Sequence, residues 1–228
     1  GKPGVAQIDV PIDVSNEELG ADDMPTPVTA AAPLIRSFPD PQLVAKAAAL
    51  LRQAERPVLL IGGGAHYSGA GEALMRLVET MHMPVVNSPT SRGVVPETHP
   101  MVLGCAGIIG YEPVGAAIEE ADLVLAIGSR LSDIQTSRGD LLPKDAPIIQ
   151  VDIEPAGIGR EYPVKIGIVA DAQGFADALV MALAAEPPEV PDSRREWTAS
   201  LAERYATWRD AWIAAAPDDG QVQPQEIV

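Results

Sequence analysis

Five short apolar runs without polar alternation constrain the fold of this chain more than any other feature of its sequence. A strand that is apolar on both faces is buried on both sides, as in a parallel sheet covered by helices. Helical patterns separate the runs, so we predict right-handed βαβ units and an α/β fold with a three-layer, Rossmann-like, doubly wound sheet. The runs are Pro57–Ile61, Pro84–Asn87, Asp122–Ile127, Pro147–Ile153 and Val164–Val169.

Segments on either side of this pattern differ from it in composition. Residues 16–39 are rich in Glu, Asp, Pro, Thr and Ala, show no sustained period and predict a linker. Residues 5–11 have the pattern of a strand without elements to cover it, which suggests a piece of a longer protein. Order begins at Asp40–Pro41, a helix cap followed by proline, and Pro187–Pro188 closes the domain.

Residues 192–216 predict a further helix that carries all three tryptophans of the chain on one stripe. The stripe either faces the core or docks on a neighbouring domain, since large apolar stripes on terminal helices also mark interfaces. Its members are Trp197, Leu201, Tyr205, Trp208 and Trp212.

The charge of the chain bears on its partners and its location. The formal net charge is −16, which repels nucleic-acid backbones and anionic lipid surfaces. No apolar run approaches the ~20 residues that a membrane span needs, and no secretory signal opens the chain. The single cysteine, Cys105, excludes an internal disulfide framework. We therefore expect no nucleic acid, no membrane and a cytoplasmic location.

Small and polar residues follow the predicted strands, at the sheet edge where parallel α/β folds bind ligands. Glycines let a ligand approach the backbone, and acids can accept hydrogen bonds from ribose or adenine. The glycines do not form the dinucleotide fingerprint, which would need glycine at Tyr67. The glycine run could equally be a tight turn, Asp171 a helix cap and Arg130 a solvated cation. The strand ends are Gly62–Gly64, Asn87–Ser88, Gly128–Arg130, Asp152 and Asp171.

No combination of residues in the sequence predicts a reaction centre. His66, His82 and His99 lie in unrelated segments without metal-ligand spacing, and we interpret them as loop or surface residues. Cys105 has no convincing base nearby and is interpreted as a small buried thiol. We therefore predict no catalytic residue and no metal site in this chain.

Taken in order, these segments resemble the central domain of thiamine-diphosphate-dependent enzymes, with acetolactate synthase large subunit and its relatives as the nearest group. The order and spacing hold over roughly residues 40–185. The resemblance implies about six mostly parallel strands of the DHS-like NAD/FAD-binding type. The matching segments are Arg56–Gly64, Met83–Val86, Arg92–Pro96, His99–Pro100, Leu103–Gly107, Ala121–Val124, Gly128–Asp133, Val151–Pro155 and Ala170–Asp171.

The resemblance also implies how the chain divides into domains and which domains bind the cofactors. Residues 1–39 would be the tail of a pyrimidine-binding domain plus a linker, 40–187 the central nucleotide-binding-like domain, and 188–228 a helix and linker toward a diphosphate-binding domain. Those neighbouring domains would bind thiamine diphosphate and Mg²⁺. The parent would be a homo-oligomeric transferase or lyase, a decarboxylase or carboligase of 2-oxo acids, and this fragment alone would be inactive.

In members of this family the central domain binds FAD, ADP or coenzyme A, or no nucleotide. Two alternatives to an enzyme part stay open at this point. One is a freestanding NAD- or FAD-binding module without thiamine diphosphate chemistry, and the other is a structural domain with a vestigial nucleotide site. Matching positions make the following residues candidate cofactor contacts: Gly62, Gly63, Gly64, Gly107, Gly128, Ser129, Arg130, Asp152 and Asp171.

Overall fold

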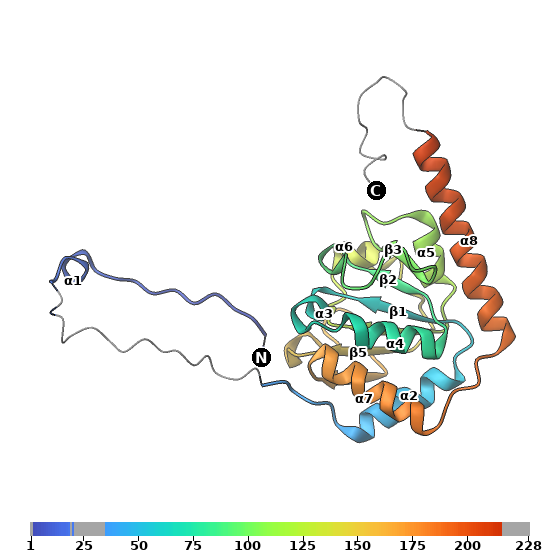
Figure 1. Cartoon of the computed structure of the whole chain (residues 1–228), viewed down its shortest axis with the longest axis horizontal. Coiled ribbons are helices and arrows are strands. Elements are labelled where there is room, and N and C mark those ends of the chain that lie inside the picture. Colours follow the sequence, from blue (N-terminus) through green and yellow to red (C-terminus); the bar gives the residue numbers. More distant parts are fainter. Residues whose placement is uncertain (1, 19, 21–34, 216–228) are drawn as a thin grey trace.

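The body of the protein is one six-stranded, all-parallel sheet (Figure 1). The computed structural model describes residues 2–18, 20 and 35–215. The strand order is β3-β2-β1-β4-β5-β6, so the direction of winding reverses between β1 and β4. This confirms the predicted doubly wound α/β fold. The strands are β1 (Pro57–Ile61), β2 (Val85–Asn87), β3 (Val102–Cys105), β4 (Leu123–Ile127), β5 (Ile148–Asp152) and β6 (Ile166–Val169).

Helices cover both faces of the sheet, and alternate strand residues contribute to two hydrophobic cores. Leu59 and Ile61 of β1 pack with α2 (Pro41–Gln53), α4 (Gly71–Met81) and α7 (Ala172–Ala185). Val58 and Leu60 pack on the other face, with α5 (Glu112–Glu119) and α8 (Asp192–Ala214). Among the described residues, no helix combines the length and the hydropathy that crossing a membrane requires.

Shorter helices lie mostly in the loops of this frame. Their positions matter because several of them bring side chains to the carboxyl edge of the sheet, where the strands end. They are α1 (Ile12–Ser15), α3 (Gly63–Ser68), α6 (Asp133–Thr136) and the 3₁₀ turns η2 (Pro89–Ser91), η3 (Ser137–Gly139) and η4 (Pro155–Gly157).

β3 is the strand that the search for apolar runs missed. It has four residues and contains Gly104, whose φ is +96°. It lies at the edge of the sheet, pairs with β2 alone and carries a register shift between Val85 and Asn87. A short edge strand with a glycine gives no apolar run in the sequence. This strand could therefore be assigned only from its pairing with β2 in the structure.

The strand expected at residues 5–11 is not formed. The structure assigns no regular element to residues 2–11, and all of them are exposed. A strand needs a hydrogen-bonded neighbour, and no described strand pairs with this segment. Of the predicted linker 16–39, residues 19 and 21–34 lie outside the described part of the chain.

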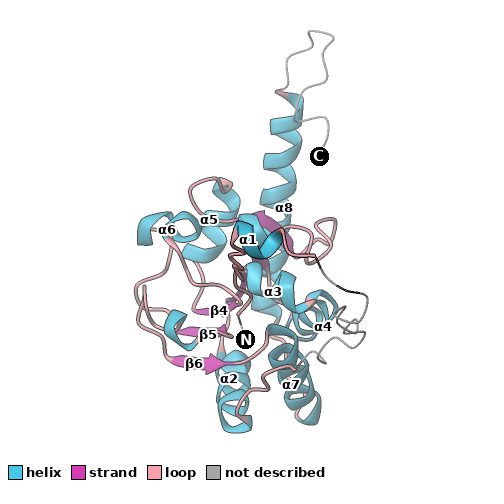
Figure 2. Cartoon of the chain, turned by 90° about the vertical axis from the view of Figure 1, so that its left-hand side faces the viewer, coloured by secondary structure: helices cyan, strands magenta, loops and turns pink. Residues whose placement is uncertain are grey.

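The tryptophan stripe of α8 faces the core over its inner half. Leu201 is fully buried, and Trp197 and Tyr205 pack against the same cluster. The Trp197 indole Nε1 donates to a Glu120 carboxylate oxygen over 2.9 Å. The helix then reaches past the sheet in Figures 1 and 2, and Trp212 is 37% exposed there. The core-facing interpretation therefore holds for the inner half, and docking of the outer half stays a prediction.

A buried guanidinium anchors the first turn of α8. Arg194 is fully buried and donates to the Met81 carbonyl oxygen over 2.8 Å and to the Leu51 carbonyl oxygen over 3.3 Å. It also donates to the Ala54 carbonyl oxygen. These carbonyls end α2 and α4, where the helix dipoles concentrate negative charge. Arg194 therefore ties α8 to the C-terminal ends of two helices.

We predict that Arg194→Ala lowers the free energy of unfolding by about 3 kcal/mol, because three carbonyls lose their buried donor. Urea denaturation of the 228-residue chain measures this change. Arg195→Ala is the matched control, since Arg195 is the next residue along and is exposed. Equal stability of the two variants would show that the buried guanidinium does not anchor α8.

Candidate functional site

The point where the strand order reverses is closed by direct backbone contact. The Gly62 N–H donates to the Ile127 carbonyl over 3.0 Å, and the Gly64 N–H donates to the Gly128 carbonyl over 2.9 Å. A Cβ on Gly64 would lie 2.8 Å from the Gly128 Cα, and a Cβ on Gly128 would lie 2.6 Å from the Ala65 nitrogen. The glycines are therefore required because the loops after β1 and β4 touch each other.

Ser129 and Gln135 fill the same place with side chains. Both are buried, and the Ser129 hydroxyl donates to the Gln135 carboxamide oxygen. The Gln135 Nε2 lies 3.5 Å from the Ile61 carbonyl oxygen, at the outer limit of a hydrogen bond. Gln135 belongs to α6, so this short helix lies against the carboxyl ends of β1 and β4.

Gly107 packs against α6 from the side of β3. Its φ is +95°, and a side chain there would overlap the Ile134 carbonyl oxygen. The next residue, Ile108, donates its N–H to that same carbonyl over 2.9 Å. Gly107 is thus a contact between two loops of the edge, and a role in cofactor binding stays a prediction.

Arg130 and Asp152 lie together at the ends of β4 and β5. Both approach Gly157 of η4, where a Cβ would lie 3.6 Å from the Arg130 Cγ and 3.9 Å from the Asp152 Oδ2. Asp152 is buried, and its Oδ1 accepts the Glu154 N–H over 2.8 Å. Arg130, by contrast, is exposed. The structure thus brings these two predicted contacts to one corner of the edge.

Gln150 is a structural part of this edge that sequence reasoning missed. Its Nε2 donates to the Ser129 carbonyl over 3.0 Å and to the Gly157 carbonyl over 3.2 Å, and its Oε1 accepts the Gly159 N–H over 2.8 Å. It joins the loops after β4 and β5. The signal was a polar residue within the apolar run Pro147–Ile153.

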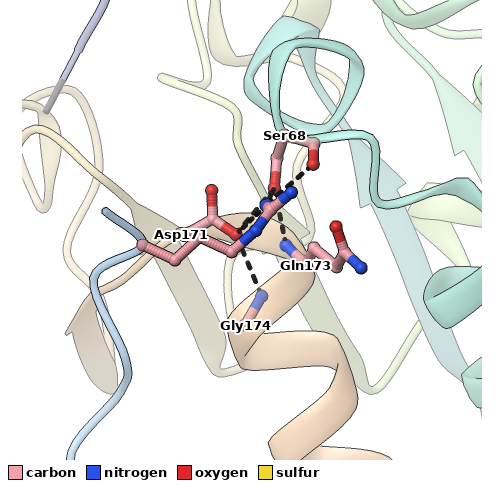
Figure 3. A network of polar contacts seen from close by, with 5 residues as sticks. Ser68, Asp171, Gln173 and Gly174 are labelled. Atoms are coloured by element: carbon pink, nitrogen blue, oxygen red, sulfur yellow. Dashed lines mark hydrogen bonds and ion pairs between the residues drawn. The ribbon is translucent and has the colours of Figure 1, made fainter. Parts of the chain in front are cut away.

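Asp171, the last predicted contact, is the cap of α7 (Figure 3). Its Oδ1 accepts the Gly174 N–H over 3.0 Å, the Ser68 hydroxyl over 2.8 Å and the Arg36 Nη1 over 2.8 Å. The Ser68 oxygen also accepts the Gln173 N–H over 2.8 Å. The capping alternative is therefore observed, and sequence reasoning missed Arg36 and Ser68 as its partners.

The protonation of Asp171 reflects this network. Burial alone would raise its pKa, but the hydrogen bonds from Gly174, Arg36 and Ser68 and the charge of Arg36 outweigh burial and hold the pKa below its usual range. Asp171 also donates its own backbone N–H to the Ser37 carbonyl over 2.8 Å. The segment that enters α2 is thereby fixed to the end of β6.

Other candidate groups lie apart from this edge or have structural roles. Cys105 is buried, and burial raises the pKa of its thiol, as expected for a structural cysteine. His82 ends α4 in a left-handed conformation. Burial and the charges of Arg195 and Arg194 lower its pKa. Within residues 2–18, 20 and 35–215, no group of three or more His, Cys, Asp or Glu could hold a metal ion.

Two open pockets lie on the surface of the described part of the chain. One, of about 410 Å³, lies between α5 and α8, with Trp208 and Arg204 in its lining. The other, of about 480 Å³, lies at the amino ends of β5 and β6, around Ile148 and Lys165. Neither includes any of the residues predicted to contact a cofactor.

Residues 44–179 match the protein family described as "Thiamine pyrophosphate enzyme, central domain". The chain belongs to this family. This confirms the resemblance drawn from the sequence, and the all-parallel sheet is of the same α/β type.

Curated relatives carry the names of acetolactate synthases. The chain is 38% identical to a "Probable acetolactate synthase large subunit" of Methanocaldococcus jannaschii, over 100% of the chain and 38% of that protein. It is 36% identical to an "Acetolactate synthase large subunit" of Corynebacterium glutamicum, over 86% of the chain and 31% of that protein. For the same-named protein of Parasynechococcus marenigrum the identity is 30%, over 100% and 36%. The chain thus spans about a third of the length of these relatives.

We predict that Gly62→Ala lowers the free energy of unfolding by about 2–3 kcal/mol, because its Cβ would lie 2.6 Å from the Ser129 Cα. Gly115→Ala in α5 is the control. Its Cβ would lie 3.4 Å from the Leu141 Cδ1, and alanine favours the helix, so stability should be equal or slightly higher. Denaturant titration measures both, and wild-type stability of Gly62→Ala would refute close loop contact.

We predict that Asp171→Ala lowers the free energy of unfolding at pH 7 by about 2 kcal/mol, and Asp171→Asn by about half as much, because asparagine can still cap α7. The folded-state pKa is lowered, so the charge stabilises the fold above the unfolded pKa of about 3.9. This contribution disappears as the pH falls through the folded pKa. Stability measured from pH 7 to 3 should therefore show wild type and Asp171→Asn converging. A constant difference would contradict the role of the charge.

Proposed function

We propose that this chain is the central, non-catalytic domain of a thiamine-diphosphate- and magnesium-dependent enzyme that acts on 2-oxo acids, as a decarboxylase or carboligase similar to acetolactate synthase. The observation that carries the proposal is the family match over residues 44–179, in a chain that covers 38% of a relative named as such a synthase. The pyrimidine- and diphosphate-binding domains of the parent would hold both cofactors, in a homo-oligomer of the cytoplasm.

The side chains of the described region support a non-catalytic role. The polar residues of the carboxyl edge are used for caps and loop contacts, as at Asp171, Gln135 and Gln150. Thiamine diphosphate, held by the neighbouring domains, would supply the nucleophilic carbanion and the electron sink for the 2-oxo acid. In this proposal no residue of the chain exchanges a proton with that substrate.

What the described part of the chain contributes is a fixed geometry between the segment that enters the sheet and the segment that leaves it. Arg36 and Ser37 bind Asp171, which lies two residues after the end of β6 at the carboxyl edge. Arg194 binds carbonyls that precede β1 and β2, at the opposite, amino edge. The incoming and outgoing segments are thus held at opposite edges of a rigid sheet. Such a block is suited to setting the separation of two flanking domains.

Activity measurements on the chain and on the full-length parent test this proposal. With pyruvate as substrate, we expect no turnover by the 228-residue chain under any condition. We expect turnover by the parent that is lost on removal of thiamine diphosphate and Mg²⁺ and restored when both return. Carbon dioxide release and product formation give the readout.

Two results would contradict the proposal. Full activity of the parent without thiamine diphosphate would rule out a thiamine-diphosphate-dependent enzyme. Tight NAD or FAD binding by this chain, in a parent that has no thiamine-diphosphate-dependent activity on any 2-oxo acid, would favour the freestanding nucleotide-binding module instead.

A further inference from the structure

We propose that this domain holds no adenine nucleotide, because its own chain occupies the place at the carboxyl edge where FAD or ADP would bind. Ser129 and Gln135 form an internal plug between the ends of β1 and β4. The inference rests on the proposed function only for the identity of the parent, and it assigns this domain to the nucleotide-free branch of its family.

Three backbone donors of the glycine loop and one after β4 are already used within the chain. A glycine loop that leads into a helix binds phosphate through free N–H groups. Here the N–H groups of Gly62, Gly64 and Ala65 donate to the carbonyls of Ile127, Gly128 and Gly62 over 3.0, 2.9 and 3.0 Å. After β4, the Gly128 N–H donates to the Val151 carbonyl over 2.8 Å. A pyrophosphate could be recognised by these four N–H groups only if it broke these bonds.

The space above the loops is filled as well. Gly64 and Gly128 leave no gap between them, since a single added Cβ atom would already overlap the opposite backbone. Ser129 and Gln135 are 3% and 4% exposed, and they hydrogen-bond to each other. The Gln150 Nε2, on β5, donates to the Ser129 carbonyl over 3.0 Å. A dinucleotide bound across the point where the strand order reverses would have to displace α6 and these side chains together.

The polar groups that stay open do not amount to a nucleotide site. Arg130 and Asp152 lie at the β4–β5 corner, on the far side of the plug from the end of β2. Both amide atoms of Asn87 lack a hydrogen-bond partner, but Asn87 is fully buried. The Ser88–Ser91 turn lies directly after it, and Ser91 is bonded to the Ile61 carbonyl over 2.7 Å. One exposed cation and a buried amide do not replace the four N–H groups that are already used.

Flavin content and nucleotide titration of the full-length parent test the inference directly. We expect the purified parent to show no flavin absorbance. We also expect no saturable change in flavin fluorescence up to about 100 µM FAD, a concentration that would nearly fill a site with a Kd of about 1 µM. ADP, followed by calorimetry over the same range, should give no binding heat. Flavin that purifies with the parent, or saturable binding of either nucleotide, would overturn the inference.

A second measurement tests the plug itself on the 228-residue chain. Gln135→Ala removes the carboxamide that bonds Ser129, so we expect the Tm to fall by about 3–6 °C. Gln53→Ala, at an exposed position near the end of α2, is the control and should leave the Tm unchanged. An unchanged Tm for Gln135→Ala would show that the side chain does not fill the crevice and would overturn the inference.

The two proposals fail in different ways. A parent that carries flavin and also requires thiamine diphosphate would refute the closed edge and leave the proposed function intact. A parent without flavin and without any thiamine-diphosphate-dependent activity would refute the proposed function alone.

Discussion

Contact between two backbone segments, the loops that follow β1 and β4, is the constraint on which the carboxyl edge of this protein depends. Gly64 donates to the Gly128 carbonyl, and neither residue leaves room for a Cβ atom. The contact joins the two strands at the point where the sheet reverses its winding, and it sets the start of α3. Ser129 and Gln135 cover the contact, and Gln150 supports it from β5. We therefore interpret this contact as a structural joint.

Charged side chains fix the two segments of the chain that enter and leave the sheet. Asp171 combines a helix cap with an ion pair to Arg36, whose side chain keeps 28% of its surface exposed. Arg194 is fully buried, and its bonds go to carbonyls at the ends of two helices. The buried guanidinium carries the larger energetic consequence, because removing it leaves several desolvated acceptors without a donor. Together the two anchors hold the connecting segments at opposite edges of the sheet, as a spacer between domains requires.

The sequence predicted the features that depend on burial, but not those that depend on contacts between distant segments of the chain. The runs at Pro57–Ile61 and Asp122–Ile127 predicted central strands, because only a strand buried on both faces is apolar throughout. β3 was missed because an edge strand with Gly104 leaves no such run. The glycines after β1 could serve a ligand or a close backbone approach, and only the position of Gly128 in space showed that the two backbones touch. Arg194 gave no signal, since its three acceptors lie 113 to 143 residues away in the chain.

Hydrogen exchange at the amides of the β1 loop tests most directly whether the chain closes its own carboxyl edge. The amides of Gly62, Gly64 and Ala65 are bonded to carbonyls of the same chain, whereas an open phosphate-binding loop would leave its N–H groups to solvent. Protected amides exchange only through opening of the structure. The closed edge predicts that Gly64 exchanges as slowly as the central residues of β1 and β4. Exchange of Gly64 at the rate of an exposed loop would contradict it and would restore a nucleotide site at this edge.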